Sequence, residues 1–425
     1  MPQKSGRVAS AVVVGGGIVG LSCALRLRQK GFHVVVLSAG GVRDAASWGN
    51  AGHIATEQVM PLASPRMLLS APGRMFALTG GALDIGWRYV GTWLPWCARY
   101  VRACDGATAR RGHLALRELL SHAMPAWRRM ACDLGAPDLL MENGHLMLWD
   151  GAADPLRAMR AVMSSDLGTA TARPMTHQER KGLAPLLGHI PRGGLAFGGT
   201  GQVRAPGLVL AALQARLRAE SGCELHQQRV TRVTSGAQGV RVILADKTSL
   251  CPDIVVMAAG VGTRDLVDGW TPPLIAERGY HVEWDHGGVP EGPPMVFADH
   301  SVIVSRFGAR MRASTFVEFT RADASPDIRK WRKLEQTVQK IGLPVRSGFS
   351  RWLGCRPTLP DYLPAIGHIP GSRGVIAACG HQHLGLTLAP CTAEMVAAIA
   401  AGEDISMNLP PFRPDRFGRT QARAA

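Results

Sequence analysis

The sequence predicts an α/β protein with two domains: a nucleotide-binding domain on a mainly parallel sheet and a second α+β domain on an antiparallel sheet. Three observations support this fold class. Near the N-terminus an apolar run is followed by a glycine-rich turn and a helical pattern. Short apolar runs, typical of central parallel strands, return at 254–258 and 374–378. Residues 280–284 and 302–319 alternate as antiparallel strands with one solvent-exposed face do.

Residues 8–37 form one predicted βαβ unit. Residues 11–14 are continuously apolar, which suits a strand buried on both faces of a sheet. Residues 18–29 place four apolar side chains on one side at helical spacing, and Gly31 ends this helix. A second strand is predicted at 33–37.

The glycine pattern Gly15-x-Gly17-x-x-Gly20 lies between that first strand and the helix. Here Gly15 permits a tight turn, Gly17 lets a pyrophosphate approach the backbone, and Gly20 lets helix and strand pack closely. The helix N-terminus offers free N–H groups to phosphates. The pattern therefore predicts a dinucleotide site.

The second strand ends on Ser38, where the dinucleotide fingerprint asks for an acidic residue that binds the ribose hydroxyls. A serine can still hydrogen-bond a ribose, but without a charge the bond is about half as strong. We therefore expect weaker or more exchangeable cofactor binding. An alternative is that Arg43 admits the 2′-phosphate of NADP.

The rest of the chain alternates between helical and strand-like stretches. Residues 60–138 are mainly helical, and their tryptophans 87, 93, 96 and 127 are expected to pack in the core. Prolines 290, 293 and 294 mark a loop, and turn residues gather at 357–364. Strands are expected at 144–149, 193–203, 224–233 and 239–245, and helices at 206–221 and up to residue 401. We expect 1–60, 196–275 and 350–425 to form the nucleotide-binding domain, and 61–195 and 276–349 the second domain.

Length and composition narrow the class of protein. The 425 residues include 46% hydrophobic and 19% charged residues, which suits a folded protein of two or three domains. The longest apolar run, 11–25, is too short and too rich in glycine to span a membrane. Because it follows Lys4 and Arg7 it imitates a secretory signal, an interpretation that its glycine spacing disfavours.

Cysteine and charge content bear on location and partners. The nine cysteines are scattered and lack any C-x-x-C pair, which argues against a disulfide framework or structural zinc and favours the cytoplasm. The net charge of +16 favours contact with an anionic membrane surface. No nucleic-acid-binding motif accompanies it, so we expect no nucleic acid partner.

Four segments resemble the FAD-dependent D-amino-acid dehydrogenases and their glycine-oxidase-like relatives in the D-amino-acid oxidase superfamily. They are AVVVGGGIVG at 11–20, SWGNAGHI at 47–54, WLGCRPTLPD at 352–361 and GHQHLGLT at 380–387. The resemblance spans nearly the full chain. It implies a Rossmann-like FAD-binding domain with FAD as cofactor.

The glycine pattern and the resemblance together give a set of expected FAD contacts along the chain. This set consists of Gly15, Gly17, Ile18, Val19, Gly20, Ser38, Ser47, Asn50, Ala51, Gly52, His53, Val230, Gly260, Gly380, His381, Leu384, Gly385, Leu386 and Thr387.

The resemblance also implies that Arg356 binds the carboxylate of the substrate. A guanidinium can make a paired contact with a carboxylate that lysine cannot copy; the alternative is a structural ion pair with Asp361. Tyr280 is expected to hydrogen-bond the other side of the substrate, and His53 and His383 are candidate bases. Cys379-x-His381-x-His383 could hold a metal, but it lacks the further ligand of a catalytic zinc site, so we expect none.

The expected activity is FAD-dependent dehydrogenation of a D-amino or D-imino acid, with D-proline and cis-4-hydroxy-D-proline as candidate substrates. Electrons would pass to a quinone or other carrier. An oxidase that uses oxygen is the first alternative. Others are a catalytically silent subunit of an oxidoreductase complex, suggested by Ser38 and Arg204, and an NADP-dependent enzyme.

Overall fold

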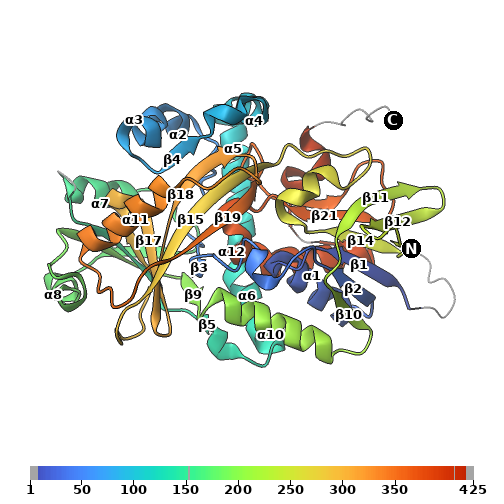
Figure 1. Ribbon diagram of the computed structural model, residues 1–425, viewed down its shortest axis with the longest axis horizontal. Coiled ribbons are helices and arrows are strands. Elements are labelled where there is room, and N and C mark those ends of the chain that lie inside the picture. Colours follow the sequence, from blue (N-terminus) through green and yellow to red (C-terminus); the bar gives the residue numbers. More distant parts are fainter. Residues whose placement is uncertain (1–7, 152–153, 406, 418–425) are drawn as a thin grey trace.

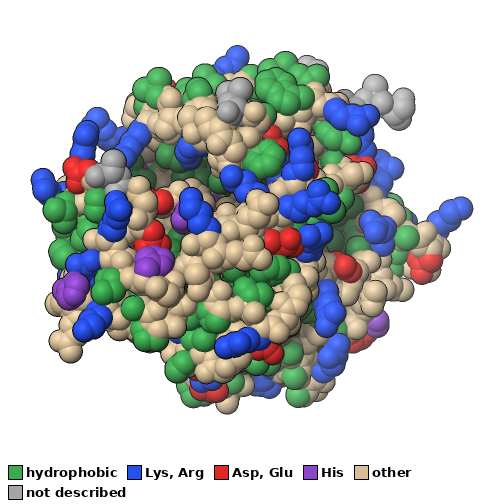
Figure 2. Space-filling model, turned by 60° about the vertical axis from the view of Figure 1, so that its left-hand side comes forward, with side chains coloured by type: hydrophobic (Ala, Val, Ile, Leu, Met, Phe, Trp, Pro, Cys, Tyr) green, Lys and Arg blue, Asp and Glu red, His purple; other side chains and the backbone are tan. Residues whose placement is uncertain are grey.

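A computed structural model describes residues 8–151, 154–405 and 407–417. Two large sheets lie side by side in it, the nucleotide sheet to the right in Figure 1 and the antiparallel sheet to the left. The predicted α/β fold class is confirmed. The residues Lys4 and Arg7, on which the secretory-signal alternative depends, lie outside the described ranges. On the face shown in Figure 2, Lys and Arg side chains are dispersed instead of forming one patch.

The nucleotide sheet has six strands taken from three separate parts of the chain. All neighbours are parallel except the last pair, β21 and β20. In spatial order the strands are β10 (Cys223–His226), β2 (His33–Leu37), β1 (Ser10–Val14), β14 (Ile254–Met257), β21 (Val375–Cys379) and β20 (Ala365–His368).

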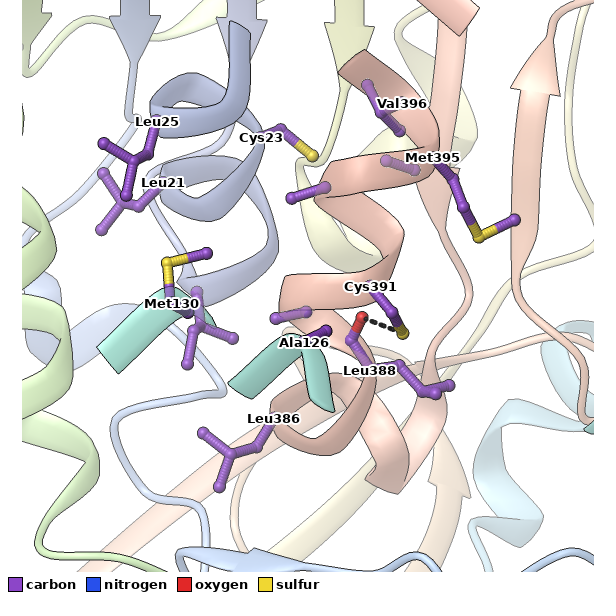
Figure 3. Packing of buried hydrophobic residues seen from close by; sticks show 14 of the residues in the cluster. Leu21, Cys23, Leu25, Ala126, Met130, Leu386, Leu388, Cys391, Met395 and Val396 are labelled. Atoms are coloured by element: carbon purple, nitrogen blue, oxygen red, sulfur yellow. Dashed lines mark hydrogen bonds between the residues drawn. The ribbon is translucent and has the colours of Figure 1, made fainter. Parts of the chain in front are cut away.

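Both faces of this sheet are covered, as its continuously apolar strands predict. Val13 faces helices α1 (Ile18–Gln29), α10 (Pro206–Ala219) and α12 (Gly385–Ala401), whereas Val12 and Val14 face the small sheet of β11 (Val230–Gly236), β12 (Gly239–Leu244) and β13 (Ser249–Leu250). Figure 3 shows Leu21 and Cys23 of α1 and Cys391 of α12 in the first of these cores.

The antiparallel sheet forms the other half of the molecule. Its long strand β15 (Ile275–Asp285) lies between β18 and β19, and strands farther along come from residues 145–198. The order is β19 (Ser350–Thr358), β15, β18 (Arg310–Thr320), β17 (Val302–Phe307), β16 (Met295–Phe297), β6 (His145–Trp149), β8 (Gly193–Gly198) and β7 (Thr171–Pro174), with β4 (Leu83–Ile85) beside β18. A third small sheet contains β3 (His53–Ile54), β9 (Gly201–Val203) and β5 (Leu140–Met141).

Most remaining helices lie between residues 65 and 187. These are α2 (Pro65–Ser70), α3 (Phe76–Thr79), α4 (Val90–Ala103), α5 (Gly106–Ser121), α6 (Ala123–Asp133), α7 (Pro155–Met163), α8 (His177–Lys181) and α9 (Ala184–Leu187); α11 (Ile328–Ile341) lies apart on the antiparallel sheet. Contrary to the predicted domain division, residues of α5 and α6 belong to the core that α1 and α12 form on the nucleotide sheet.

Three further expectations are wrong in detail. The strand β15 has no solvent-exposed face. Helix α11 covers one side of the sheet, and every residue of the strand except Glu283 and Asp285 is buried. The strand β19, placed by sequence in the nucleotide-binding domain, pairs with β15 instead. The side chain of Trp87 is exposed, while the other three tryptophans of the helical segment are buried.

One helical stretch, Gln382–Ala401, is long and apolar enough to cross a membrane by length and composition alone. However, 67% of its apolar window is buried inside the fold, between α1 and α6. Burial of this kind is typical of a central core helix.

Candidate functional site

A cavity of about 1650 Å³ lies between the two large sheets and is lined by residues of both. Ordinary small-molecule pockets measure roughly 300–1,000 Å³. This cavity therefore has room for a dinucleotide together with a small substrate.

The glycine turn forms one end of the cavity. Gly15 has φ +127°, and a Cβ on it would lie 2.2 Å from the carbonyl oxygen of Ala258, so only glycine fits. A Cβ on Gly20 would lie 1.9 Å from the oxygen of Gly15, which explains the close contact of helix α1 with β1. Gly17, Ile18 and Val19 line the cavity, so the positive end of helix α1 faces it. These features fit a bound pyrophosphate.

Ser38 follows β2 and lines the cavity at this end. Its hydroxyl donates to the carbonyl oxygen of Gly40 at 2.9 Å, which leaves the oxygen lone pairs to accept from a ribose hydroxyl. Asp44, which sequence reasoning did not single out, lines the cavity nearby. Arg43 does not line it; its guanidinium lies 5.5 Å from the centre of the Trp48 ring, so the basis for the NADP alternative is lost.

The segment 47–54 extends along the cavity from this end. The Ser47 hydroxyl accepts from the backbone N–H of Ile18 at 3.1 Å and so ties the segment to the start of α1. Asn50 accepts from the N–H of Gly52 at 2.8 Å, which stabilises a turn in which Gly52 has φ +76°.

Most of the expected cofactor residues line the cavity, and a few stand behind it. Those that line it are Gly15, Gly17, Ile18, Val19, Ser38, Ser47, Asn50, Ala51, His53, Val230, Gly260, His381, Gly385 and Leu386. Gly20, Gly52, Gly380, Leu384 and Thr387 do not. Thr387, for example, accepts from the N–H of Ala55 at 3.0 Å and so supports the wall from behind.

Arg356 of β19 lines the opposite part of the cavity, and its ion-pair partner is Glu277, not Asp361. Its Nη1 donates to Glu277 at 3.1 Å and to the carbonyl oxygen of Phe316 at 3.0 Å. Among the described residues no other nitrogen of this guanidinium has a hydrogen-bond partner. Asp361 is paired with Arg416 instead.

Glu277 holds this arginine from a buried position, with 1% of the residue exposed. It also accepts from the hydroxyls of Thr358 at 3.0 Å and Tyr362 at 3.2 Å. Phe316, the second partner of the arginine, has φ +69° where the pairing of β15 and β18 shifts register. Sequence reasoning missed both residues because they lie about 80 and 40 positions away.

The expected substrate contact by the Tyr280 hydroxyl is not supported. This hydroxyl donates to Glu318 at 2.9 Å and accepts from Arg278 at 3.2 Å and from the N–H of Asp327 at 3.1 Å. One donor and two acceptor sites are all that a phenol offers. Tyr280 itself lines the cavity, but its hydroxyl belongs to a buried ionic cluster with Arg278 and Glu318.

The histidines of segment 379–383 do not converge on one point. His381 is buried and contacts the Thr392 hydroxyl at 3.0 Å, while His383 lines the cavity and contacts Gln58 at 2.7 Å. Burial lowers the pKa of each ring to about 4, so both are neutral at pH 7. Cys379 lies in the core of the nucleotide sheet.

His53 lines the cavity but cannot serve as a free base. Its Nδ1 lies 3.0 Å from the carbonyl oxygen of Gly201 and its Nε2 lies 3.2 Å from Glu57. Burial alone would raise the pKa of Glu57, but His53 outweighs that effect and the pKa falls to about 2. His145, whose pKa burial lowers to about 3, completes a group that sequence reasoning missed because β3 and β6 are far apart in the chain.

Comparisons with known proteins agree with this architecture. The chain is 28% identical to a D-amino-acid oxidase of Bradyrhizobium diazoefficiens, over 95% of this chain and 98% of the relative. It is 27% identical to D-amino acid dehydrogenase 2 of Pseudomonas aeruginosa, over 91% and 93%. The crystal structure of glycine oxidase from Geobacillus kaustophilus shares the fold, with a TM-score of 0.68 at 20% identity, covering 96% of this chain and 99% of that one.

The family model described as "DAO: FAD dependent oxidoreductase" matches residues 10–399. That range contains the glycine turn, Arg356 and the segment 380–387. The protein is therefore an oxidoreductase with FAD as its cofactor, and the chain belongs to the DAO family of FAD-dependent oxidoreductases.

Proposed function

We propose that this enzyme oxidises a D-amino or D-imino acid at its α-carbon, with D-proline and cis-4-hydroxy-D-proline as candidate substrates. The observation that carries the proposal is the cavity-facing guanidinium of Arg356, whose Nη1 is held by two partners while its other nitrogens have no partner within residues 8–151, 154–405 and 407–417. A held guanidinium with free N–H groups suits a carboxylate. The names of the relatives, which act on amino acids, support the same substrate class.

The surroundings of Arg356 suit oxidation of a substrate at its α-carbon. The chemistry that FAD supplies when bound is acceptance of a hydride from the α-carbon. Arg356 fixes the carboxylate and so orients that carbon. His383 is neutral at pH 7, so its ring can accept a hydrogen bond from the neutral amine of a substrate that loses a hydride from its α-carbon. Apolar cavity residues such as Trp96 and Phe319 exclude water.

The test is a panel of D-amino acids, glycine and cyclic imino acids with an artificial electron acceptor, for wild type and Arg356→Ala. We expect KM for the best substrate to rise roughly 30- to 5,000-fold, since loss of one partner of a paired charge costs about 2–5 kcal/mol. Arg351→Ala is the matched control, because Arg351 lies on the same strand but pairs with Glu335 on the surface. An unchanged KM in Arg356→Ala would remove the carboxylate assignment.

We further propose a membrane-bound quinone as electron acceptor, reached from the cytoplasm through a patch on helices α2 to α4. This α2–α4 patch consists of Leu69, Trp87, Val90, Leu94 and Val101, which are 47% to 82% exposed. Val101 also lines the cavity, so the patch adjoins the mouth of the site.

Vesicle sedimentation tests the membrane contact. We expect the wild type to bind vesicles with anionic lipids, and a Trp87→Ser/Leu94→Ser variant to bind at least about 10-fold more weakly. Leu208→Ser on α10, which removes an equally exposed leucine elsewhere, is the control. Equal binding by all three proteins would reject the patch.

The rival activities are separated by two simple measurements. Peroxide released in proportion to substrate consumed would establish an oxidase and reject the quinone. Protein that neither carries flavin absorbance nor recovers it with added FAD would favour a silent subunit.

A further inference from the structure

Three side chains beside the cavity form a cluster that substrate oxidation does not use. They are His53 of β3, His145 of β6 and Glu57, which follows β3. One ligand atom from each lies within 4.8 Å of the others. Two imidazoles and a carboxylate make up the protein ligand set of many catalytic zinc sites.

In both histidines Nδ1 contacts an oxygen of the protein, so Nε2 is the nitrogen that can bind a metal. The Nδ1 of His53 lies 3.0 Å from the carbonyl oxygen of Gly201, and the Nδ1 of His145 lies 3.0 Å from the hydroxyl of Thr200. The ring of His145 also stacks on Phe197, with centroids 4.1 Å apart. Outer contacts of this kind fix the tautomer and orientation of metal-binding histidines and leave Nε2 as the ligand.

Two buried atoms of the cluster have no partner among the described residues: the Nε2 of His145 and the Oε2 of Glu57. The first belongs to a residue that is 1% exposed and the second to a side chain that is 10% exposed. A buried polar atom without a partner costs about 1–3 kcal/mol. One cation placed among the three side chains would satisfy both atoms.

We propose that the Nε2 atoms of His53 and His145 and the carboxylate of Glu57 bind one divalent transition-metal ion, for which Zn²⁺ is the probe. His53 and Glu57 line the cavity whereas His145 does not, so the open position of the ion faces the cavity, where water or a polar group of the substrate can enter.

The competing explanation is a plain ion pair between His53 and Glu57. That arrangement needs a proton on each nitrogen of His53, because both face oxygen acceptors. It also leaves His145 Nε2 and Glu57 Oε2 unsatisfied. A metal ion bound by the three side chains satisfies both of these atoms.

The experiment is Zn²⁺ titration calorimetry with elemental analysis on the FAD-loaded full chain, purified without a polyhistidine tag and treated with chelator. We expect one tightly bound Zn²⁺ per chain. His145→Gln and Glu57→Gln should each weaken binding by at least about 100-fold, because loss of an outer partner alone costs 10- to 100-fold. Zn²⁺ should raise the Tm of the wild type and not that of either variant.

His226→Gln is the matched control, because it removes a surface histidine that is paired with Glu224. It should keep the tight Zn²⁺. Wild-type binding no tighter than that of His145→Gln, or tight binding lost in His226→Gln, would overturn the proposal. Bound flavin in the chelator-treated variants shows that they are folded, so their lost affinity counts as support.

Discussion

At the scale of single residues, Gly279 determines where the guanidinium of Arg356 lies. It sits on β15 beside the strand of the arginine, and a Cβ there would lie 2.3 Å from Nη2 of Arg356. The atom that would clash is the far end of a flexible side chain, so the fold can tolerate a methyl group while the guanidinium cannot keep its place.

Gly279→Ala should therefore act mainly on the substrate. We expect KM to rise about 10-fold or more, because a displaced guanidinium loses the alignment of a paired contact. The displacement also weakens the ion pair with the buried Glu277, so the free energy of unfolding should fall by about 1–3 kcal/mol, and flavin content should be that of the wild type. Steady-state kinetics and urea unfolding measure the two effects. A large loss of stability with KM unchanged would contradict this account of the glycine.

Ser38 allows a second prediction, about the cofactor. Ser38→Asp places a carboxylate where its lone pairs can accept from the ribose hydroxyls, and a charged acceptor is roughly twice as strong as a neutral one. We expect FAD to bind about 5-fold more tightly, a gain of about 1 kcal/mol. Calorimetric titration of the apoprotein with FAD measures it, and Ser38→Ala serves as the comparison. Weaker binding to Ser38→Asp than to Ser38→Ala would mean that the nearby Asp44 already fills that role.

How far single residues could be predicted depends on where their partners lie in the chain. The glycine turn is local, so Gly15 and Gly20 could be assigned from spacing alone. Glu277, Glu57 and His145 carry no local signal, since their roles come from contacts across the two sheets. The Tyr280 hydroxyl was misassigned because its partners Glu318 and Asp327 come from other elements.

At the scale of secondary-structure elements, β18 and α11 are joined by a buried ionic cluster. Lys330 of α11 is 0% exposed and pairs with Glu318 and with Asp84 of β4. Arg278 of β15 pairs with the same glutamate at 2.7 Å. Helix α11 was not predicted from the sequence. Its buried face begins with Lys330 and continues with Leu334, Val338 and Ile341. A charged residue at a core position hides the helical period.

Glu318→Gln should destabilise the protein by roughly 3–5 kcal/mol, because it leaves the buried Arg278 without a carboxylate partner and Lys330 with Asp84 alone. Urea unfolding measures the change. Glu335→Gln is the control. It removes the carboxylate that pairs with Arg351 near the surface, and it should lower the free energy of unfolding by less than about 1 kcal/mol. Equal costs for the two variants would show that the buried cluster is not what joins α11 to the sheet.

At the scale of the whole molecule, the central strands of the nucleotide sheet can be predicted from the sequence, but the boundary between the two sheets cannot. Apart from Ser10, the residues of strands β1, β14 and β21 are all apolar because both faces of the sheet are covered, and this pattern can be recognised although the strands are far apart in the chain. Strand β19 was misplaced because Gly354 and Pro357 give it the composition of a turn. Only pairing with β15 shows its true place, and pairing leaves no trace in a single sequence.

The buried neutral histidines of the two halves make stability depend on pH. Burial lowers the pKa of His281 from 6.5 to about 3, with Arg312 adding to the effect, and its ring also bonds the carbonyl oxygen of Gly49 at 3.1 Å. Below pH 6.5 the unfolded chain binds a proton at this histidine that the folded chain does not, so stability falls as the pH falls.

His281→Gln, which keeps a donor for the Gly49 oxygen, should flatten this dependence. Each such histidine contributes a slope of up to about 1.4 kcal/mol per pH unit between pH 6.5 and the folded pKa. We therefore expect the unfolding free energy of the variant to fall less steeply by that amount between pH 6 and pH 4.5, while above pH 7.5 the two curves run parallel. Urea unfolding of the FAD-loaded enzyme across this range measures both slopes. If the slopes below pH 6 coincide, the folded protein takes up the proton at His281 without unfolding, and the ring is less enclosed than its contacts with Trp352 and Gly49 indicate.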